Sequence, residues 1–295
     1  MYCKIWGVRG SLPVPGASTL KYGGNTTCIE VNGHDDECII LDAGTGIFPL
    51  GQHLARTEIK KIHLFITHTH WDHIQGFTMF QPLFSDDVEI HIYGPKDPTS
   101  GLTIKDHLTN QMDRHFFPVQ LQNVAARLIF EDVTGGDRIR INSLIVKTFE
   151  FNHTAINIGY RIDSENRSII FTGDHEWKLN PHPSDDPRFS NMEQSIKATR
   201  QETINFIKGV DLLIIDSAYT EEEYLTRHGW GHGTLDSSIT AAREACAKQV
   251  LFTHHDPSRT DDELDKVFRE SLERNAINSK DPEFALAKEG MEIKL

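Results

Sequence analysis

The hydrophobic positions of this chain fall into short runs that are rich in β-branched residues and end at polar or glycine-containing turns. Such runs are typical of buried strands. The first residues, MYCKIWGVRG, also look like the start of a strand. We expect strands over residues 26–31, 37–44, 61–68, 88–94, 143–151, 158–162, 168–174, 210–216 and 249–254.

Three helix-like stretches alternate with the later strands. They cover residues 191–208, the sequence LDSSITAAREACAK after the good N-cap Thr234, and a segment that opens at SRTDDELDKVFRESLE. Strands and helices mixed in this way favour a layered α/β fold. No Pro/Gly/Ser-rich linker or fixed repeat interrupts the pattern, so we expect a single domain over residues 1–295.

Composition limits the partners. The chain has 295 residues, 25% of them charged, with a formal net charge of −13. That charge argues against a large nucleic acid, because such binding relies on Lys and Arg, but not against a small phosphorylated substrate. No run of 18 apolar residues or signal-peptide-like start is present, so we expect no membrane contact. Four scattered cysteines without a CxxC predict free thiols in a reducing, cytoplasmic setting.

The stretch THTHWDHIQG carries the strongest chemical signal. His68 and His70 are two residues apart after an apolar strand, so their rings point the same way if the chain is extended. Asp72 and His73 follow as the chain turns toward a helix and can face a second point nearby. Imidazole and carboxylate are ligands that zinc prefers, and manganese or iron also suit this mixed set.

Other candidate groups occur at the ends of later strands. His153, Asp174, Asp216 and His254 each lie at, or just after, the end of a strand-like run. Sites in α/β folds are built where strand ends meet at one edge of a sheet. We therefore expect these side chains to converge with the histidines of the THTHWDH segment.

THTHWDH resembles the signature of the metallo-β-lactamase-fold hydrolases, and the similarity extends from GVRGSLPVPG to LFTHHDPSR. The resemblance implies a four-layer αββα sandwich and two divalent metal ions. By this comparison the first metal is held by His68, His70 and His153, the second by Asp72, His73 and His254, and Asp174 bridges both.

Some assignments stay open within this resemblance. His254 and His255 are neighbours, and the similarity of THHDPSR to the THFSPRY ending of related enzymes favours His254 as ligand, with His255 lining the pocket. Asp42 in LDAGTG is either a buried carboxylate that braces the ligand loop or an ordinary turn residue. His175 and Glu176 either support the ligands or lie on the surface.

A second motif bears on the reaction. DLLIIDSAY, followed by GWGHGT, resembles the arrangement in ribonuclease Z, the tRNA 3′-end endonuclease. The comparison places Asp216 at the acidic position and His232 at the histidine position. Phosphodiester cleavage needs a nucleophile, which two metals supply as hydroxide, and a proton for the leaving alkoxide. His232 would donate that proton, with Asp216 fixing its tautomer; a structural histidine near a helix start is the alternative.

The sequence also departs from ribonuclease Z. Asp216 replaces a glutamate, Ile215 replaces a preceding histidine, and no basic Gly/Pro-rich arm is evident. The N-terminal VRGSLPVPG and YGGNTTC and the HHDP ending look more like bacterial phosphodiesterase-like members, including those similar to cyclic-nucleotide phosphodiesterases. This resemblance implies a dinuclear metal phosphodiesterase that acts on a small nucleotide-like diester, cyclic diesters included, with Asp72, Asp216 and His232 as catalytic candidates. The alternatives are an acyl hydrolase, such as a lactonase or thioesterase, and a ribonuclease Z-type nuclease. A non-catalytic sensor is disfavoured because no ligand is lost.

Residues 100–123 separate two strand-like regions and include Phe116 and Phe117 before Pro118. We expect this segment to cap the mouth of the site or to form a homodimer interface, with ordinary core packing as the alternative. The remaining histidines carry no motif and are expected to be structural or exposed: His34, His53, His63, His91, His107, His115, His182 and His228.

Overall fold

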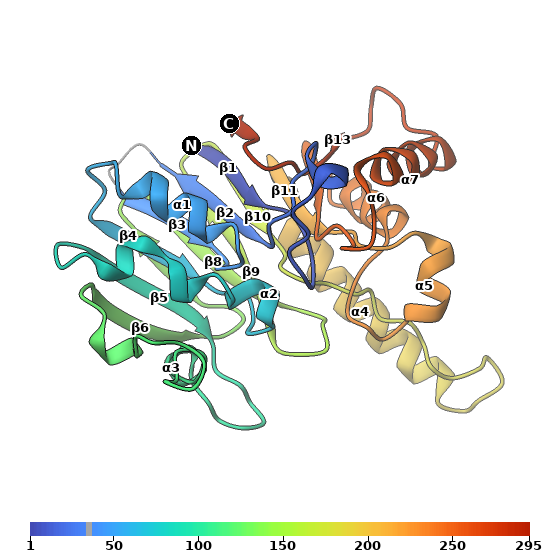
Figure 1. Cartoon of the computed structure of the whole chain (residues 1–295). Coiled ribbons are helices and arrows are strands. Elements are labelled where there is room, and N and C mark those ends of the chain that lie inside the picture. Colours follow the sequence, from blue (N-terminus) through green and yellow to red (C-terminus); the bar gives the residue numbers. More distant parts are fainter. Residues whose placement is uncertain (34–36) are drawn as a thin grey trace.

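Two seven-stranded mixed sheets lie face to face, with helices on their outer faces (Figure 1). The computed structural model describes residues 1–33 and 37–295, so His34 lies outside the described residues. The two termini lie close together (Figure 1), because the strand before the C-terminus pairs with the first strand of the chain.

The first sheet combines an antiparallel and a parallel half. Its order is β14 (Glu292–Lys294), β1 (Tyr2–Gly7), β2 (Cys28–Asn32), β3 (Glu37–Leu41), β4 (Lys61–Phe65), β5 (Glu89–Pro95) and β6 (Arg127–Val133). Strands β3 to β6 are parallel, and the pairs from β14 to β3 are antiparallel. Parallel strands are usually buried on both faces, which explains the nearly continuous apolar runs of β3 and β4.

The second sheet has the same mixed character. Its order is β13 (Glu283–Leu286), β12 (Gln249–Thr253), β11 (Leu212–Asp216), β10 (Ser168–Phe171), β9 (Asn157–Asp163), β8 (Leu144–Phe151) and β7 (Arg138–Ile141). Strands β10 to β13 are parallel, so β10, β11 and β12 end at the same edge. That edge carries the candidate site.

Helices complete the outer layers. Those before β8 are α1 (Ile47–Leu54), α2 (Trp71–Ile74) and α3 (Ile104–Gln111); those after it are α4 (Phe189–Ile207), α5 (Glu221–Arg227), α6 (Leu235–Glu244) and α7 (Asp261–Arg274). One apolar cluster joins the first sheet to α1 and α3, a second joins the other sheet to α4, α6 and α7, and a third fills the space between the sheets. The predicted four-layer αββα sandwich is confirmed.

Packing between the sheets also fixes the start of the ligand loop. The ring of Tyr160 on β9 meets Phe65 at the end of β4 with centroids 5.1 Å apart. The Tyr160 hydroxyl donates a hydrogen bond of 2.6 Å to the carbonyl of Ile66. The second sheet thus holds the backbone of the first sheet two residues before His68.

All nine predicted strands are present, with ends shifted by a few residues, and Thr234 caps α6 as predicted. The helix-like stretch over 191–208 corresponds to α4. Several elements were not predicted, including α1, which contains Pro49 and Gly51, and β6 and β7, which are only partly buried. Within residues 1–33 and 37–295, no helix combines the length and apolar character needed to cross a membrane.

Candidate metal centre

The polar side chains that the sequence places after strands meet at one edge of the sandwich. His68 follows β4, His153 follows β8, Asp174 follows β10, Asp216 ends β11 and His254 follows β12. His70, Asp72 and His73 come from the turn that enters α2. The ligand atoms of these residues form three overlapping groups, and within each group they lie within 4.8 Å of one another.

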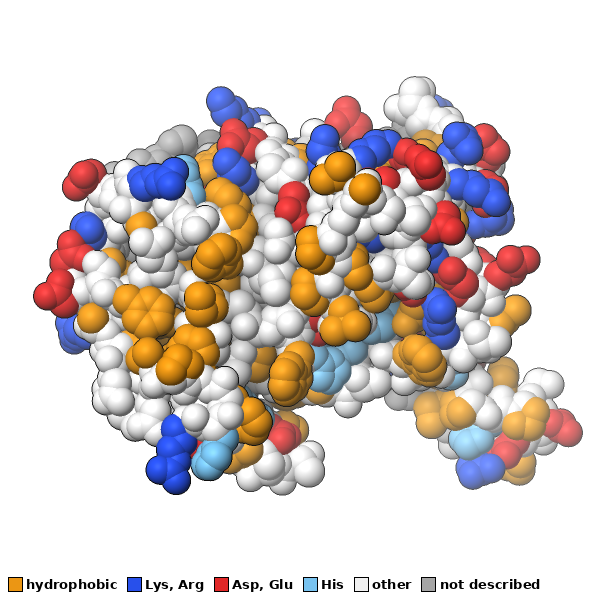
Figure 2. All heavy atoms as spheres, in the orientation of Figure 1, with side chains coloured by type: hydrophobic (Ala, Val, Ile, Leu, Met, Phe, Trp, Pro, Cys, Tyr) orange, Lys and Arg blue, Asp and Glu red, His pale blue; other side chains and the backbone are white. Residues whose placement is uncertain are grey.

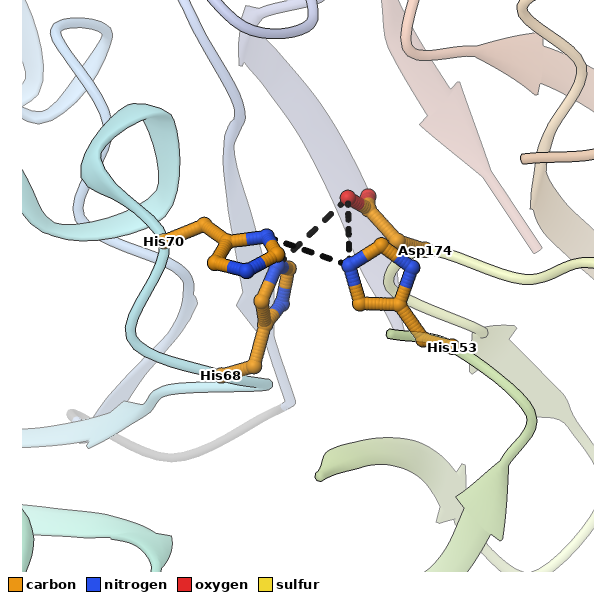
Figure 3. A group of neighbouring side chains, drawn as sticks. All are labelled: His68, His70, His153 and Asp174. Atoms are coloured by element: carbon orange, nitrogen blue, oxygen red, sulfur yellow. Dashed lines mark hydrogen bonds and ion pairs between the residues drawn. The ribbon is translucent and has the colours of Figure 1, made fainter. Parts of the chain in front are cut away.

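The first group brings together side chains from both sheets (Figure 3). The Nδ1 atom of His70 lies 3.1 Å from the Nε2 atom of His153. The Oδ2 atom of Asp174 lies 3.5 Å from His68 Nε2 and 3.7 Å from His153 Nε2. His70 is exposed, so this group is open to solvent.

The second group consists of Asp72, His73 and His254 and lies next to Asp174 of the first. His73 Nε2 lies 3.3 Å from Asp72 Oδ2, and His254 Nε2 lies 3.2 Å from the same oxygen. The Oδ1 atom of Asp174 is 3.2 Å from His73 Nε2 and 3.3 Å from His254 Nε2. The two carboxylate oxygens of Asp174 therefore face two different groups, which is the arrangement a bridging ligand needs.

These separations fit metal ions. Four ligand atoms at about 2.0–2.1 Å from a tetrahedral zinc lie roughly 3.3 Å from one another. In addition, His68 Nε2, His73 Nε2 and Asp174 Oδ1 are buried without a hydrogen-bond partner among the described residues. Buried polar atoms are nearly always paired, so these three converging atoms, two of which lie only 3.2 Å apart, fit a site that could hold cations. The residues present fit two divalent metals.

Electrostatics support the same conclusion. Burial by itself would lower the pKa of His73, but the carboxylates of Asp174, Asp72 and Asp42 raise it well above its usual range. Burial likewise opposes protonation of His254, yet Asp174 and Asp216 raise its pKa to about 9. Burial lowers the pKa of His68, His70 and His153 in the other group, so excess negative charge, which a metal ion would neutralise on displacing protons, gathers around His73 and His254.

Asp42 braces a ligand of each group. It is fully buried, at a positive φ of 62°. Its Oδ2 atom lies 2.7 Å from His73 Nδ1 and accepts a hydrogen bond from the Thr67 hydroxyl at 2.9 Å. That hydroxyl lies 3.0 Å from Nδ1 of His68. Because Nδ1 of His68 and Nδ1 of His73 are engaged in these contacts, each ring presents Nε2 to the centre. Such hydrogen bonds behind a ligand fix its orientation.

The neighbours His254 and His255 face different surroundings. His254 has a positive φ of 60°, and a Cβ on Gly10 would lie 2.1 Å from its ring, so a glycine must stand there. His255 does not line the pocket as expected: it is 1% exposed, and its Nε2 donates a hydrogen bond of 2.9 Å to the carbonyl of Ala287. The structure thus brings only the first of the two to the centre.

His232 and Asp216 form a pair beside the centre. His232 Nδ1 lies 2.8 Å from Asp216 Oδ2, and the His232 ring stacks on that of His254 with centroids 4.5 Å apart. The same nitrogen is 3.8 Å from Asp174 Oδ2. Asp216 also accepts backbone hydrogen bonds from His175 at 3.1 Å and Ala218 at 3.2 Å. A neutral His232 with its Nδ1 proton directed at Asp216 would carry a lone pair at Nε2, and the protonated ring would carry a transferable proton there.

Glu176 holds the loop that precedes His232. Its carboxylate accepts hydrogen bonds from the Tyr224 hydroxyl at 2.7 Å and from the backbone N–H groups of Gly229 at 2.7 Å and Gly231 at 2.8 Å. The carbonyl of Gly231 in turn accepts from Nδ1 of His153 at 2.8 Å. Glu176 therefore supports this loop and is not a surface residue. The glycines of GWGHG are the feature of the sequence that could have indicated a tightly held loop.

His175, the other residue left open, belongs to the core. It is 3% exposed and packs against the rings of Phe151 and Trp177. Burial lowers its pKa to about 4. A contact that the sequence did not reveal lies on the other side of the centre, where the backbone N–H of Ser11 donates a hydrogen bond of 2.7 Å to Asp72 Oδ2.

Two cavities flank the centre. One, of about 620 Å³, is lined by His153, Thr154 and Lys178 among others. The other, of about 410 Å³, is lined by Trp71, Phe116 and Phe117, so part of segment 100–123 lies beside the ligand loop. Figure 2 shows histidine side chains near the middle of one face with hydrophobic side chains on either side.

Comparisons with known proteins agree with this geometry. Residues 38–255 match the family described as "Beta-lactamase superfamily domain". Ribonuclease Z of Bacillus subtilis is 23% identical over 233 residues, covering 67% of this chain and 70% of that protein. The crystal structure of the metallo-beta-lactamase fold protein YhfI from Bacillus subtilis has a TM-score of 0.68 at 16% identity, with 99% of both chains covered. A diphosphatase from the PhnP family has a TM-score of 0.63 at 19% identity, with 100% of this chain and 97% of the other covered. The predicted resemblance to metallo-β-lactamase-fold hydrolases is confirmed, and the chain belongs to the beta-lactamase superfamily.

Proposed function

We propose that this hydrolase is a dinuclear metal phosphodiesterase that cleaves a small, nucleotide-like phosphodiester. His68, His70 and His153 would hold one divalent metal, Asp72, His73 and His254 the other, and Asp174 would bridge them. When bound, two such ions activate water as a nucleophile and stabilise the charge that develops on the phosphoryl group. Zinc suits the ligand set, and manganese or iron would also fit.

The observation that carries the proposal is the His232–Asp216 pair. Loss of an alkoxide requires a proton, because an alkoxide is a strong base. His232 stacks on a proposed ligand, and its Nδ1 is fixed by a carboxylate at 2.8 Å. In the protonated ring, Nε2 is then the atom that would give up the proton. Asp216 orients the ring.

Size and charge support a small substrate. The cavities beside the centre, of about 620 and 410 Å³, are in the range of small-molecule sites. The net charge of −13 opposes a long polyanion. Lys178 at the wall of the larger cavity offers local positive charge for a phosphorylated group.

RNA cleavage is the second candidate, and the relatives named ribonuclease Z favour it. The same residues would serve, since the chemistry at phosphorus is unchanged. The two candidates differ in salt dependence: a long RNA needs several phosphate contacts, so its affinity would fall steeply as salt rises.

A parallel substrate panel tests the proposal. Purified protein with measured metal content is assayed on cyclic mononucleotides, cyclic dinucleotides, a precursor tRNA and an acyl-homoserine lactone. We expect turnover of at least one small diester that exceeds turnover of the lactone. Efficient cleavage of the tRNA alone would favour the nuclease, and efficient opening of the lactone without diester turnover would replace the proposal with acyl hydrolysis.

A further inference from the structure

The cavity of about 410 Å³ has an unusual wall beside the ligand loop. Trp71 and Phe116 are each 79% exposed, which makes them the most exposed tryptophan and phenylalanine side chains among the described residues. Both line this one cavity, together with the half-buried Phe117. A contiguous patch of large, solvent-exposed apolar side chains often marks a binding site.

The cavity borders the loop that carries the proposed ligands. Thr69, which lies between the proposed ligands His68 and His70, lines it. Trp71 lies between His70 and Asp72. A diester with its phosphorus at the centre would therefore extend its next group along the ligand loop into this space.

The rest of the cavity wall includes two glutamine side chains. Gln75 and Gln111 line the cavity, and each donates its amide N–H to the protein, to Thr26 Oγ1 at 3.1 Å and to the Ile74 carbonyl at 2.8 Å. Aromatic faces combined with oriented amides suit a flat ring with hydrogen-bonding edges better than an acyl chain.

We infer that this cavity, walled by Trp71, Phe116 and Phe117, binds the nucleobase of the substrate. The inference rests on the proposed phosphodiesterase function and adds to it the part of the substrate that is recognised. Stacking of a base on an aromatic side chain is sequence-tolerant, so purines and pyrimidines are both admitted.

The experiment compares two substrates that differ only in the base: adenosine 2′,3′-cyclic phosphate and methyl ribofuranoside 2,3-cyclic phosphate. Wild type, Trp71→Ala and Phe116→Ala are assayed on both, with metal content measured. Phe84→Ala is the control, because Phe84 is also exposed, at 45%, but lines a different cavity. We expect Trp71→Ala and Phe116→Ala to lose about 5- to 150-fold in kcat/KM on the adenosine substrate, through KM. Both variants should stay within roughly twofold of wild type on the abasic one.

Calorimetric binding of adenosine monophosphate to the same proteins gives a readout that does not depend on turnover. We expect the same two variants to weaken it and the control to leave it unchanged. Equal losses on both substrates, unchanged nucleotide binding, or dissociation of a dimer in Phe116→Ala without loss of nucleotide binding would overturn the inference. If wild type cleaves neither diester, the wider substrate panel decides the proposed function, while the binding measurement still tests the base site.

Discussion

Replacement of His232 by alanine separates proton donation from every other role of the site. His232 is not one of the proposed metal ligands, but its side chain is only 12% exposed, so its loss leaves a space beside the ring of His254. Asp216 would keep the backbone hydrogen bonds from His175 and Ala218 after the ring is gone. The proposed metal ligands are all retained, so we expect folding and metal content to survive in His232→Ala.

The size of the effect follows from the leaving group. General acid catalysis contributes roughly 10²- to 10⁴-fold where the leaving group needs a proton, which corresponds to about 3–5 kcal/mol of barrier. A ribose alkoxide needs that proton. A nitrophenolate departs largely without it, so bis(p-nitrophenyl) phosphate should lose less than about tenfold.

The assay measures kcat on a nucleotide diester and on bis(p-nitrophenyl) phosphate for wild type, His232→Ala, Asp216→Asn and His228→Ala. Asp216→Asn should show the same selective loss more weakly, because it disturbs the orientation of the donor without removing it. His228 is a matched control: it lies in the same segment but its side chain is 48% exposed. Equal losses on both substrates in His232→Ala would refute the donor role and indicate phosphate binding or a structural role instead.

Three further changes test other parts of the account. Asp174→Ala should lose both metals, because its two oxygens face different ligand groups; full metal content by mass spectrometry would contradict the bridging role. In Glu176→Gln the new amide N–H group would face one of the three donors whose hydrogen bonds the carboxylate now accepts. We therefore expect metal affinity or kcat to fall about 10- to 100-fold. Tyr224→Phe, which removes only one of these hydrogen bonds, is the milder comparison. Burial, together with the nearby His91 and Lys61, lowers the pKa of His63 to about 4 in the folded protein. As pH falls from about 6.5 to 4, this histidine is therefore protonated in the unfolded chain but not in the folded one, and stability is lost over that window. Between pH 7 and pH 5, the free energy of unfolding measured with urea should fall by roughly 1–2 kcal/mol less in His63→Gln than in wild type. Equal falls in the two proteins would refute the lowered pKa of His63.

The sequence revealed the strands and the candidate ligands because both have local signatures. Apolar runs that end at His68, Asp174 and Asp216 are visible as patterns of neighbouring residues. The short helix α1 was not visible, because Pro49 and Gly51 within it argue against a helix, and only packing on the first sheet stabilises it.

The supports of the site depend on contacts between distant residues. Glu176 reaches Gly231 across 55 positions, and Ser11 reaches Asp72 across 61. Residue type alone could not distinguish His254 from His255, because both are histidines; burial does not distinguish them either, since both are buried in the structure. What separates them is the backbone, which directs His254 to Asp72 and His255 to the carbonyl of Ala287.

The central claim is that two metal ions and this ligand set together carry out phosphodiester hydrolysis. The most direct measurement removes metal with a chelator, adds zinc back in steps, and records metal per chain and diester hydrolysis on the same samples. The account predicts an inactive apoprotein whose activity rises to its maximum at about two ions per chain. Full activity in the stripped protein, or a maximum reached at a single ion, would contradict it.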